Sequence, residues 1–159
     1  MATMPSYQIT EFGGSVSEVI QYIPEPTGTE VLVRVTHARV CHSDLHIADG
    51  YCDLGGESRM ALGDRGVKLP HTIGHEVLGN LVKAGPNAGD VPFGTSRLVH
   101  PWIGCMECLE CQRGRKNHCV KVQSIGEFRA GGYAEYALVP HPKFLVDADG
   151  IDPAVALPY

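Results

Sequence analysis

The sequence predicts a mostly β domain, built as a small barrel that carries a cysteine-rich lobe. Its 159 residues include 19 glycines and 11 prolines, a composition that favours turns over long helices. Several short stretches alternate apolar and polar residues, as half-buried strands do. Four of the six cysteines fall within fifteen residues. The length suits one domain with its own core and is short for two.

The first elements are expected to be a hairpin, a strand and a short helix. Residues 6–23 can form the hairpin, which turns at Gly13 and Gly14. Residues 30–38 alternate cleanly, with three valines on one face, and predict a half-buried strand. Ser43 or Asp44 can then cap a short helix that runs to Gly50.

The middle of the chain is expected to contain a long loop and a second well-defined strand. Residues 51–70 are rich in glycine and lack periodicity, so we expect a loop that shapes a pocket. Residues 76–84 predict a strand with a bulge or a close backbone approach at Gly79. The remaining expected elements are strands over residues 97–100, 131–140 and 143–146, and a helix that Asp152 caps with Pro153 at its first position.

The clearest motif is a C-x2-C-x2-C-x7-C array. It consists of Cys105, Cys108, Cys111 and Cys119. Four thiolates this close can surround one Zn²⁺ tetrahedrally, and the glycines beside them let the backbone fold back. A disulfide pair or a redox C-x-x-C is the alternative. The array predicts a structural zinc, which by itself names no function.

A second group of reactive side chains is fainter. Five of them crowd into six positions: Cys41, His42, Ser43, Asp44 and His46. Cys41 and His75 are good zinc ligands, and Asp44 could hold the far nitrogen of a ligating imidazole. Spacing alone leaves open whether Cys41 and His75 bind a metal, act in catalysis or are structural.

Composition argues against several classes of partner. The net charge is −5, which disfavours nucleic acid or an anionic membrane as the main partner. No apolar stretch approaches the roughly 20 residues that a membrane span needs. Clustered thiols without a recognisable secretory signal fit a reducing compartment, so we expect a cytoplasmic protein.

Four segments in the same order resemble the zinc-dependent alcohol dehydrogenases of the medium-chain dehydrogenase/reductase superfamily. They are residues 41–46, 74–76, 105–119 and 131–136. The resemblance runs from about residue 30 to the end and implies a GroES-like, partly open β-barrel with short helices over residues 1–150. The zinc lobe would span about 101–121, and residues 151–159 would begin the connection to a dinucleotide-binding domain. No G-x-G-x-x-G occurs here, so that Rossmann domain is not in these residues.

The resemblance also implies roles for single residues. Cys41 and His75 would bind a catalytic zinc, which Glu76 can also approach, and Asp44 would support His75. Ser43 and His46 would relay a proton from the bound alcohol to solvent. The resemblance also places His42 near the cofactor and Trp102 in the substrate pocket. Helix capping for Ser43 and Asp44, and a core position for Trp102, are the alternatives.

The other candidates have no matched role. We interpret Cys52, His37, His71, His100, His118 and His141 as structural or surface residues. The family's third protein ligand to the catalytic zinc, usually a cysteine, does not occur in residues 154–159. We therefore expect the 159-residue chain by itself to bind a catalytic zinc weakly and to oxidise alcohols little or not at all.

The implied activity is oxidation of an alcohol to an aldehyde or ketone, with hydride transfer to NAD or NADP. The partners would be a small-molecule alcohol or aldehyde and further copies of the enzyme in a homo-oligomer. The main rival is a stand-alone, zinc-stabilised binding module without catalysis. Such a module has no use for the residues around Cys41 and His75.

Overall fold

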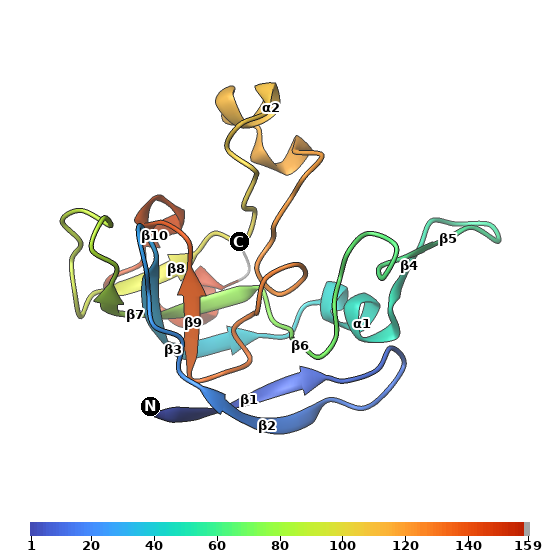
Figure 1. Cartoon of the computed structure of the whole chain (residues 1–159), viewed down its shortest axis with the longest axis horizontal. Coiled ribbons are helices and arrows are strands. Elements are labelled where there is room, and N and C mark those ends of the chain that lie inside the picture. The colour runs from blue at the N-terminus through green and yellow to red at the C-terminus, as the bar shows by residue number, and fades with distance from the viewer. Residues whose placement is uncertain (158–159) are drawn as a thin grey trace.

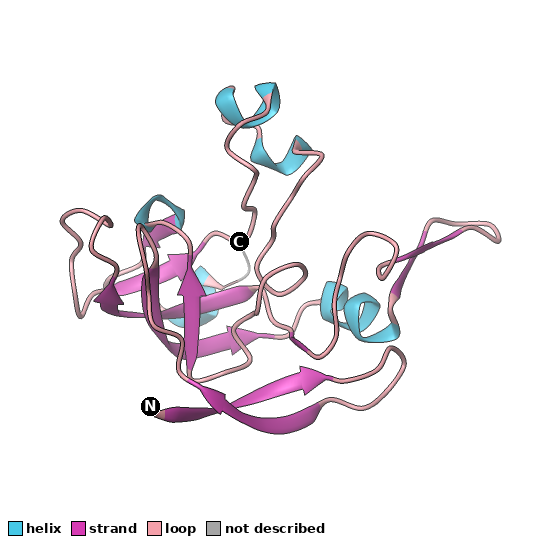
Figure 2. Ribbon diagram, viewed as in Figure 1, coloured by secondary structure: helices cyan, strands magenta, loops and turns pink. Residues whose placement is uncertain are grey.

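The computed structural model describes residues 1–157 and is dominated by strands (Figure 1, Figure 2). A five-stranded sheet has the order β10-β8-β7-β3-β9, a three-stranded sheet has the order β2-β1-β6, and β4 pairs with β5. The strands are β1 (Thr3–Ile9), β2 (Ser17–Tyr22), β3 (Val31–Arg39), β4 (Tyr51–Asp53), β5 (Arg59–Ala61), β6 (His71–Thr72), β7 (Glu76–Ala84), β8 (Ser96–Val99), β9 (Tyr136–Val139) and β10 (Leu145–Asp147). Pro158 and Tyr159, in the expected connection 151–159, lie outside the described residues.

Strand β3 lies inside the five-stranded sheet, where it pairs antiparallel with β7 on one side and β9 on the other. The strand predicted for residues 30–38 is confirmed, with Val31 and Val33 fully buried and Arg34 exposed. The alternation is not complete, because Leu32 on the opposite face is also buried. The main core packs around these valines and contains Val77, Leu81, Val99, Ile125, Val139 and Phe144. This core holds β3 against β7. As a result Cys41, which follows β3, lies near His75, which precedes β7.

The expected irregularity at Gly79 is confirmed. A Cβ on Gly79 would overlap the backbone of Arg34 on β3, so only glycine fits this crossing. The register shifts next to it, where His37 pairs with Leu78 and Val35 pairs with Gly79. The extra residue of the bulge therefore belongs to β3, and the bulge turns the end of β3 toward the helix that follows.

The expected unbroken loop over residues 51–70 is wrong. Its first part forms the β4–β5 hairpin, in which Tyr51 pairs with Ala61. Gly55 and Gly56 both have positive φ at the turn, and strands of three residues are too short to leave a visible alternation. The predicted strand 131–140 is also too long, since β9 begins only at Tyr136. Before it, Gly131 and Gly132 pack closely against neighbouring residues and Ala134 forms an isolated bridge with Ser6.

The helices are short. Helix α1 (His42–Asp49) ends at Gly50, as expected, but its N-cap is Cys41 and not Ser43 or Asp44. The Asp44 carboxylate accepts a hydrogen bond from the Cys41 backbone at 2.9 Å, so Asp44 closes a capping box from the third helical position. The predicted cap of α3 (Pro153–Ala156) is confirmed, since Asp152 accepts from Ala154 at 2.9 Å.

A lobe projects from the sheets and carries α2 (Leu109–Gln112) and the 3₁₀ turn η1 (Lys116–His118) (Figure 1). A second 3₁₀ turn, η2 (Pro142–Phe144), occupies the start of the strand expected over residues 143–146, so β10 begins only at Leu145. None of the helices in residues 1–157 has the length and apolar composition that crossing a membrane would require.

Candidate metal centres and the adjoining cavity

The four cysteines of the lobe gather around one point. Their sulfur atoms all lie within 4.8 Å of one another. The Sγ atoms of Cys105 and Cys111 are 4.0 Å apart and those of Cys108 and Cys119 are 3.8 Å apart, far beyond the roughly 2.05 Å of a disulfide. All six cysteines are free thiols. The arrangement fits a closed, tetrahedral Cys₄ zinc site.

Backbone amides support negative charge on these sulfurs. The amide of Cys105 donates to Cys119 Sγ at 3.3 Å, and that of Cys108 donates to Cys105 Sγ at 3.4 Å. Hydrogen bonds from the backbone of Glu107 and Cys108 lower the pKa of Cys105 to about 6. Burial instead raises the pKa of Cys111 to about 12. A bound cation would be needed to hold all four as thiolates.

Local backbone geometry creates this site. A Cβ on Gly104 would overlap the sulfur of Cys111, and Met106, between the first two cysteines, has a φ of 67°. The four ligands therefore all come from residues 104–119, and the amide of Lys121, just beyond them, also donates to Cys119 Sγ at 3.3 Å.

The second cluster forms where two strands meet. Cys41 follows β3 and begins α1, and His75 and Glu76 stand at the start of β7. The β3–β7 register pairs Arg39 with Glu76. One ligand atom from each of Cys41, His75 and Glu76 lies within 4.8 Å of the others. Sulfur, nitrogen and carboxylate oxygen are the donors of catalytic zinc sites.

Asp44 ties this cluster together. Its Oδ1 lies 3.2 Å from His75 Nδ1 and accepts from the Gly74 amide at 3.3 Å. Its Oδ2 accepts from the Cys41 amide at 2.9 Å and from the Tyr133 hydroxyl at 2.7 Å. Burial opposes the charge, but the hydrogen bonds from His75, Cys41 and Tyr133 outweigh it and lower the pKa of Asp44. Asp44 is thus both part of the cap and the partner of His75.

The ligand atoms that His75 and Glu76 leave available indicate a cation site. The hydrogen bond that His75 donates to Asp44 raises the pKa of His75 to about 9 despite burial. Since Nδ1 faces Asp44, Nε2 is left for a metal. Glu76 Oε2 is buried without a hydrogen-bond partner in the described part of the chain, and Arg39 Nε is 3.8 Å away. A metal ion here would satisfy an otherwise orphaned oxygen.

A cavity of about 400 Å³ opens beside this cluster. Five of the residues singled out in the sequence line it: Ser43, His46, His75, Glu76 and Trp102. Trp102 is 45% exposed, so the alternative of a core position is wrong. His42 is exposed and not part of this lining; its ring contacts that of His46.

Sequence reasoning missed the four other residues of the cavity wall that carry a thiol or a polar side chain: Cys52, His100, Ser124 and Glu127. Cys52 was interpreted from the sequence as a structural or surface residue without a role. It lies in the cavity wall because it belongs to the β4–β5 hairpin, which was not predicted. His100 could have been assigned to the cavity from the sequence, because it lies only two residues before Trp102. Ser124 donates to Glu127 Oε2 at 2.8 Å, which places a carboxylate at the cavity. No sequence pattern marks Glu127.

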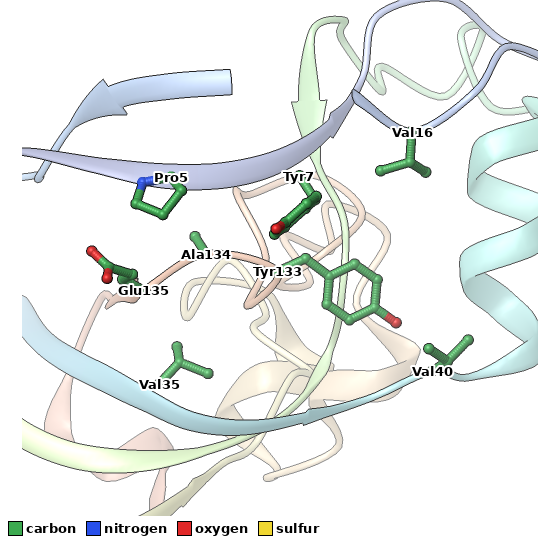
Figure 3. Close-up of a pocket in the computed structure, with 8 residues that line it drawn as sticks. All are labelled: Pro5, Tyr7, Val16, Val35, Val40, Tyr133, Ala134 and Glu135. Carbon is green, nitrogen blue, oxygen red and sulfur yellow. The ribbon is translucent and has the colours of Figure 1, made fainter. Parts of the chain in front are cut away.

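A separate apolar groove has Tyr133 in its wall (Figure 3). It has a volume of about 530 Å³ and is lined by Pro5, Tyr7, Val16, Val35, Val40, Tyr133, Ala134 and Glu135. The phenol of Tyr133 points toward Val40 in Figure 3, and its hydroxyl reaches Asp44. Tyr133 therefore connects the groove to the second cluster. A Cβ on Gly74 would overlap the Tyr133 ring, so glycine is required there.

Comparison with known proteins identifies the family. Residues 27–149 match the sequence profile described as "Alcohol dehydrogenase GroES-like domain". The chain belongs to this family, and the fold and family expected from the sequence are confirmed.

Relatives and solved structures agree with this assignment. An NAD-dependent alcohol dehydrogenase of Sulfurisphaera tokodaii is 37% identical over 142 residues, which are 89% of this chain and 40% of the relative. That of Saccharolobus solfataricus is 34% identical over 98% of this chain and 44% of the relative. The crystal structure of D-arabinose dehydrogenase from Sulfolobus solfataricus superposes with a TM-score of 0.81 at 31% identity, covering 99% of this chain and 44% of that one. The chain thus spans about two fifths of the length of these relatives.

Proposed function

We propose that this chain is the substrate- and zinc-binding domain of an NAD(P)-dependent alcohol dehydrogenase. The observation that carries the proposal is the cluster of Cys41, His75 and Glu76 at the wall of a cavity that Ser43 and His46 also line. A zinc ion held there would supply Lewis-acid polarisation of a substrate oxygen and lower the pKa of its hydroxyl. NAD or NADP would bind to a domain outside these residues.

The chain's own residues would then position the substrate and move its proton. Asp44 holds the His75 imidazole in one tautomer, with Nε2 turned toward Cys41 and Glu76. Ser43 and His46 offer a hydroxyl and an imidazole in the same wall, which is a route for a proton toward solvent. Trp102 would cover the apolar part of an alcohol, and Glu127 with Ser124 would accept hydrogen bonds from its polar substituents.

The domain layout expected from the sequence is part of this proposal. Residues 1–150 form the catalytic domain, with the lobe at about 101–121 and residues 151–159 as the start of a connection. The Cys₄ site would hold a structural zinc, supported by four converging sulfurs. The free thiols favour the cytoplasm as its location. A homo-oligomer remains a prediction from the family.

Cobalt substitution tests the two proposed metal sites. Cobalt bound by thiolates absorbs in the visible and near-ultraviolet, so Co²⁺ titration should fill a Cys₄ site first and a weaker second site afterwards. Cys41→Ala and His75→Ala should each abolish the second phase and leave the first intact. A second phase that persists in both variants would contradict the proposed centre.

Hydride transfer is best tested in a chimaera. Residues 1–157 would replace the matching region of the Saccharolobus solfataricus alcohol dehydrogenase, which supplies the rest of the enzyme. We expect NADH formation from primary or secondary alcohols, abolished by Cys41→Ala or His75→Ala. A chimaera that binds NADH and both zinc ions but oxidises no alcohol would contradict the proposal. A stand-alone binding module predicts that neither substitution changes its function.

A further inference from the structure

Helix α1 carries two imidazoles one turn apart. His42 and His46 occupy positions i and i+4, which lie on the same face of a helix. Their ring centroids are 4.8 Å apart, with the planes inclined at 61°. His42 is exposed and His46 half-buried, and within residues 1–157 neither ring has a hydrogen bond or ion pair. Both rings can therefore turn a nitrogen toward one shared ligand.

We propose that His42 and His46 chelate a divalent transition metal such as Ni²⁺, Cu²⁺ or Zn²⁺. Imidazole nitrogen suits these ions. The helix already holds the two rings in contact, so chelation requires little further ordering of the backbone. Asp49 lies three residues beyond His46 on the same stripe, at the last position of α1. Within residues 1–157 Asp49 does not group with the two imidazoles as a third ligand, so the proposed chelate consists of His42 and His46.

This site is distinct from the cluster around Cys41, although the two are neighbours. The sulfur of Cys41 converges with His75 and Glu76, and neither His42 nor His46 belongs to that group. Cys41 is the N-cap of α1, whereas the imidazole pair begins at the first residue of the helix and ends one turn later. Two different sets of donor atoms thus flank the start of α1.

A consequence follows that rests on the proposed function. His46 lines the cavity and is the imidazole assigned to proton transfer. A metal bound between His42 and His46 would occupy a nitrogen of that imidazole and interrupt the relay. Excess transition metal would then inhibit the enzyme without displacing the metal at Cys41.

The binding site can be tested without any activity. The background is the zinc-loaded chain carrying Cys41→Ser and His75→Asn, which removes the proposed catalytic ligands and keeps a capping residue at position 41. Ni²⁺ is the probe, and paramagnetic broadening of the histidine ring resonances reports where it binds. We expect His42 and His46 to broaden first, and His42→Asn or His46→Asn to weaken Ni²⁺ binding on the order of tenfold or more. His37→Asn, an exposed histidine on β3, is the matched control and should leave binding unchanged.

The outcomes separate this inference from the proposed function. Equal Ni²⁺ affinity in His42→Asn and in the background chain, or earlier broadening of another histidine, would overturn the chelate site. That result would leave the cobalt and chimaera experiments on Cys41 and His75 unaffected. If the double background does not fold, His42→Asn and His46→Asn in the zinc-loaded wild-type chain give the same comparison against His37→Asn.

Discussion

The two cysteine-containing clusters differ in how they are made. The lobe draws four ligands from fifteen consecutive residues and shapes them with local turns. The second cluster takes Cys41 from the end of β3 and His75 with Glu76 from the start of β7, and it needs the β3–β7 register to exist. The first can therefore organise its own metal locally, whereas the second depends on the whole domain and on Asp44.

The largest expected effect is the loss of the lobe on metal removal. Structural zinc binding contributes on the order of 10–16 kcal/mol in zinc-finger peptides. Cys111→Ser should therefore unfold residues of about 101–121 and leave the core around Val31 and Val33 folded. The measurement is a two-dimensional amide NMR spectrum with the zinc content per chain, and Cys52→Ser is the control. Simultaneous loss of the core resonances would show that the lobe is not an independent unit.

The next effect concerns the second cluster. Asp44→Asn keeps the side-chain shape but removes the charge that faces His75 and an acceptor for the four donors around it. Loss of such an outer partner lowers metal affinity by about 10–100-fold. We expect that loss in the weak phase of a Co²⁺ titration and no change in the Cys₄ phase. A change of similar size in both phases would mean that the two clusters are coupled.

The pH dependence of metal affinity should also distinguish the two clusters. Because the pKa of His75 is raised to about 9 by Asp44, a metal must displace a proton from this imidazole at neutral pH. Apparent affinity at Cys41 and His75 should rise with pH, by up to about tenfold per unit, and level off above pH 9. In the metal-free chain the sign is opposite: stability from the His75–Asp44 pair is fully present below the unfolded pKa and is lost as pH rises through about 9. Asp44→Asn should flatten both profiles, and an unchanged profile would contradict the role of this pair.

The smallest effect is expected for Tyr133. Tyr133→Phe removes one of the donors to Asp44 but keeps the ring that packs over Gly74. The free energy of unfolding should fall by about 1 kcal/mol. Metal affinity should weaken a few-fold at Cys41 and stay unchanged at the lobe. Urea unfolding and the Co²⁺ titration measure the two quantities. An affinity loss as large as that of Asp44→Asn would instead make Tyr133 the main support of the carboxylate.

The sequence predicted the local features of the fold better than the long-range ones. The strand around Val31 and Val33, the close backbone approach at Gly79 and the cap at Asp152 follow from short patterns, and the structure contains all three. The β4–β5 hairpin was not predicted because its strands are too short to show alternation. Strand 131–140 was overextended because the close packing of Gly131 and Gly132 is a tertiary effect.

The same distinction holds for the candidate site. The four lobe cysteines could be grouped from spacing, whereas Cys41 and His75 needed a family resemblance to be joined. Tyr133 acts through a contact with Asp44, 89 residues away in the chain, and no single-sequence pattern reports such a contact. The partner of Glu127, Ser124, is only three residues away, but nothing in the sequence shows that this pair lies at the cavity. The cavity positions of Cys52 and His100 became visible only with the hairpin and the end of β8 in place.

The shared carboxylate of Asp44 has a consequence for how the second cluster opens. The amides of Cys41 and Gly74 both donate to it, although they belong to different parts of the chain. Neither amide can exchange its hydrogen for deuterium until that carboxylate is released. The two amides should therefore exchange with a common opening free energy, as members of one cooperative unit. A ligand of this cluster would not swing out alone; the start of α1 and the turn before β7 would open together.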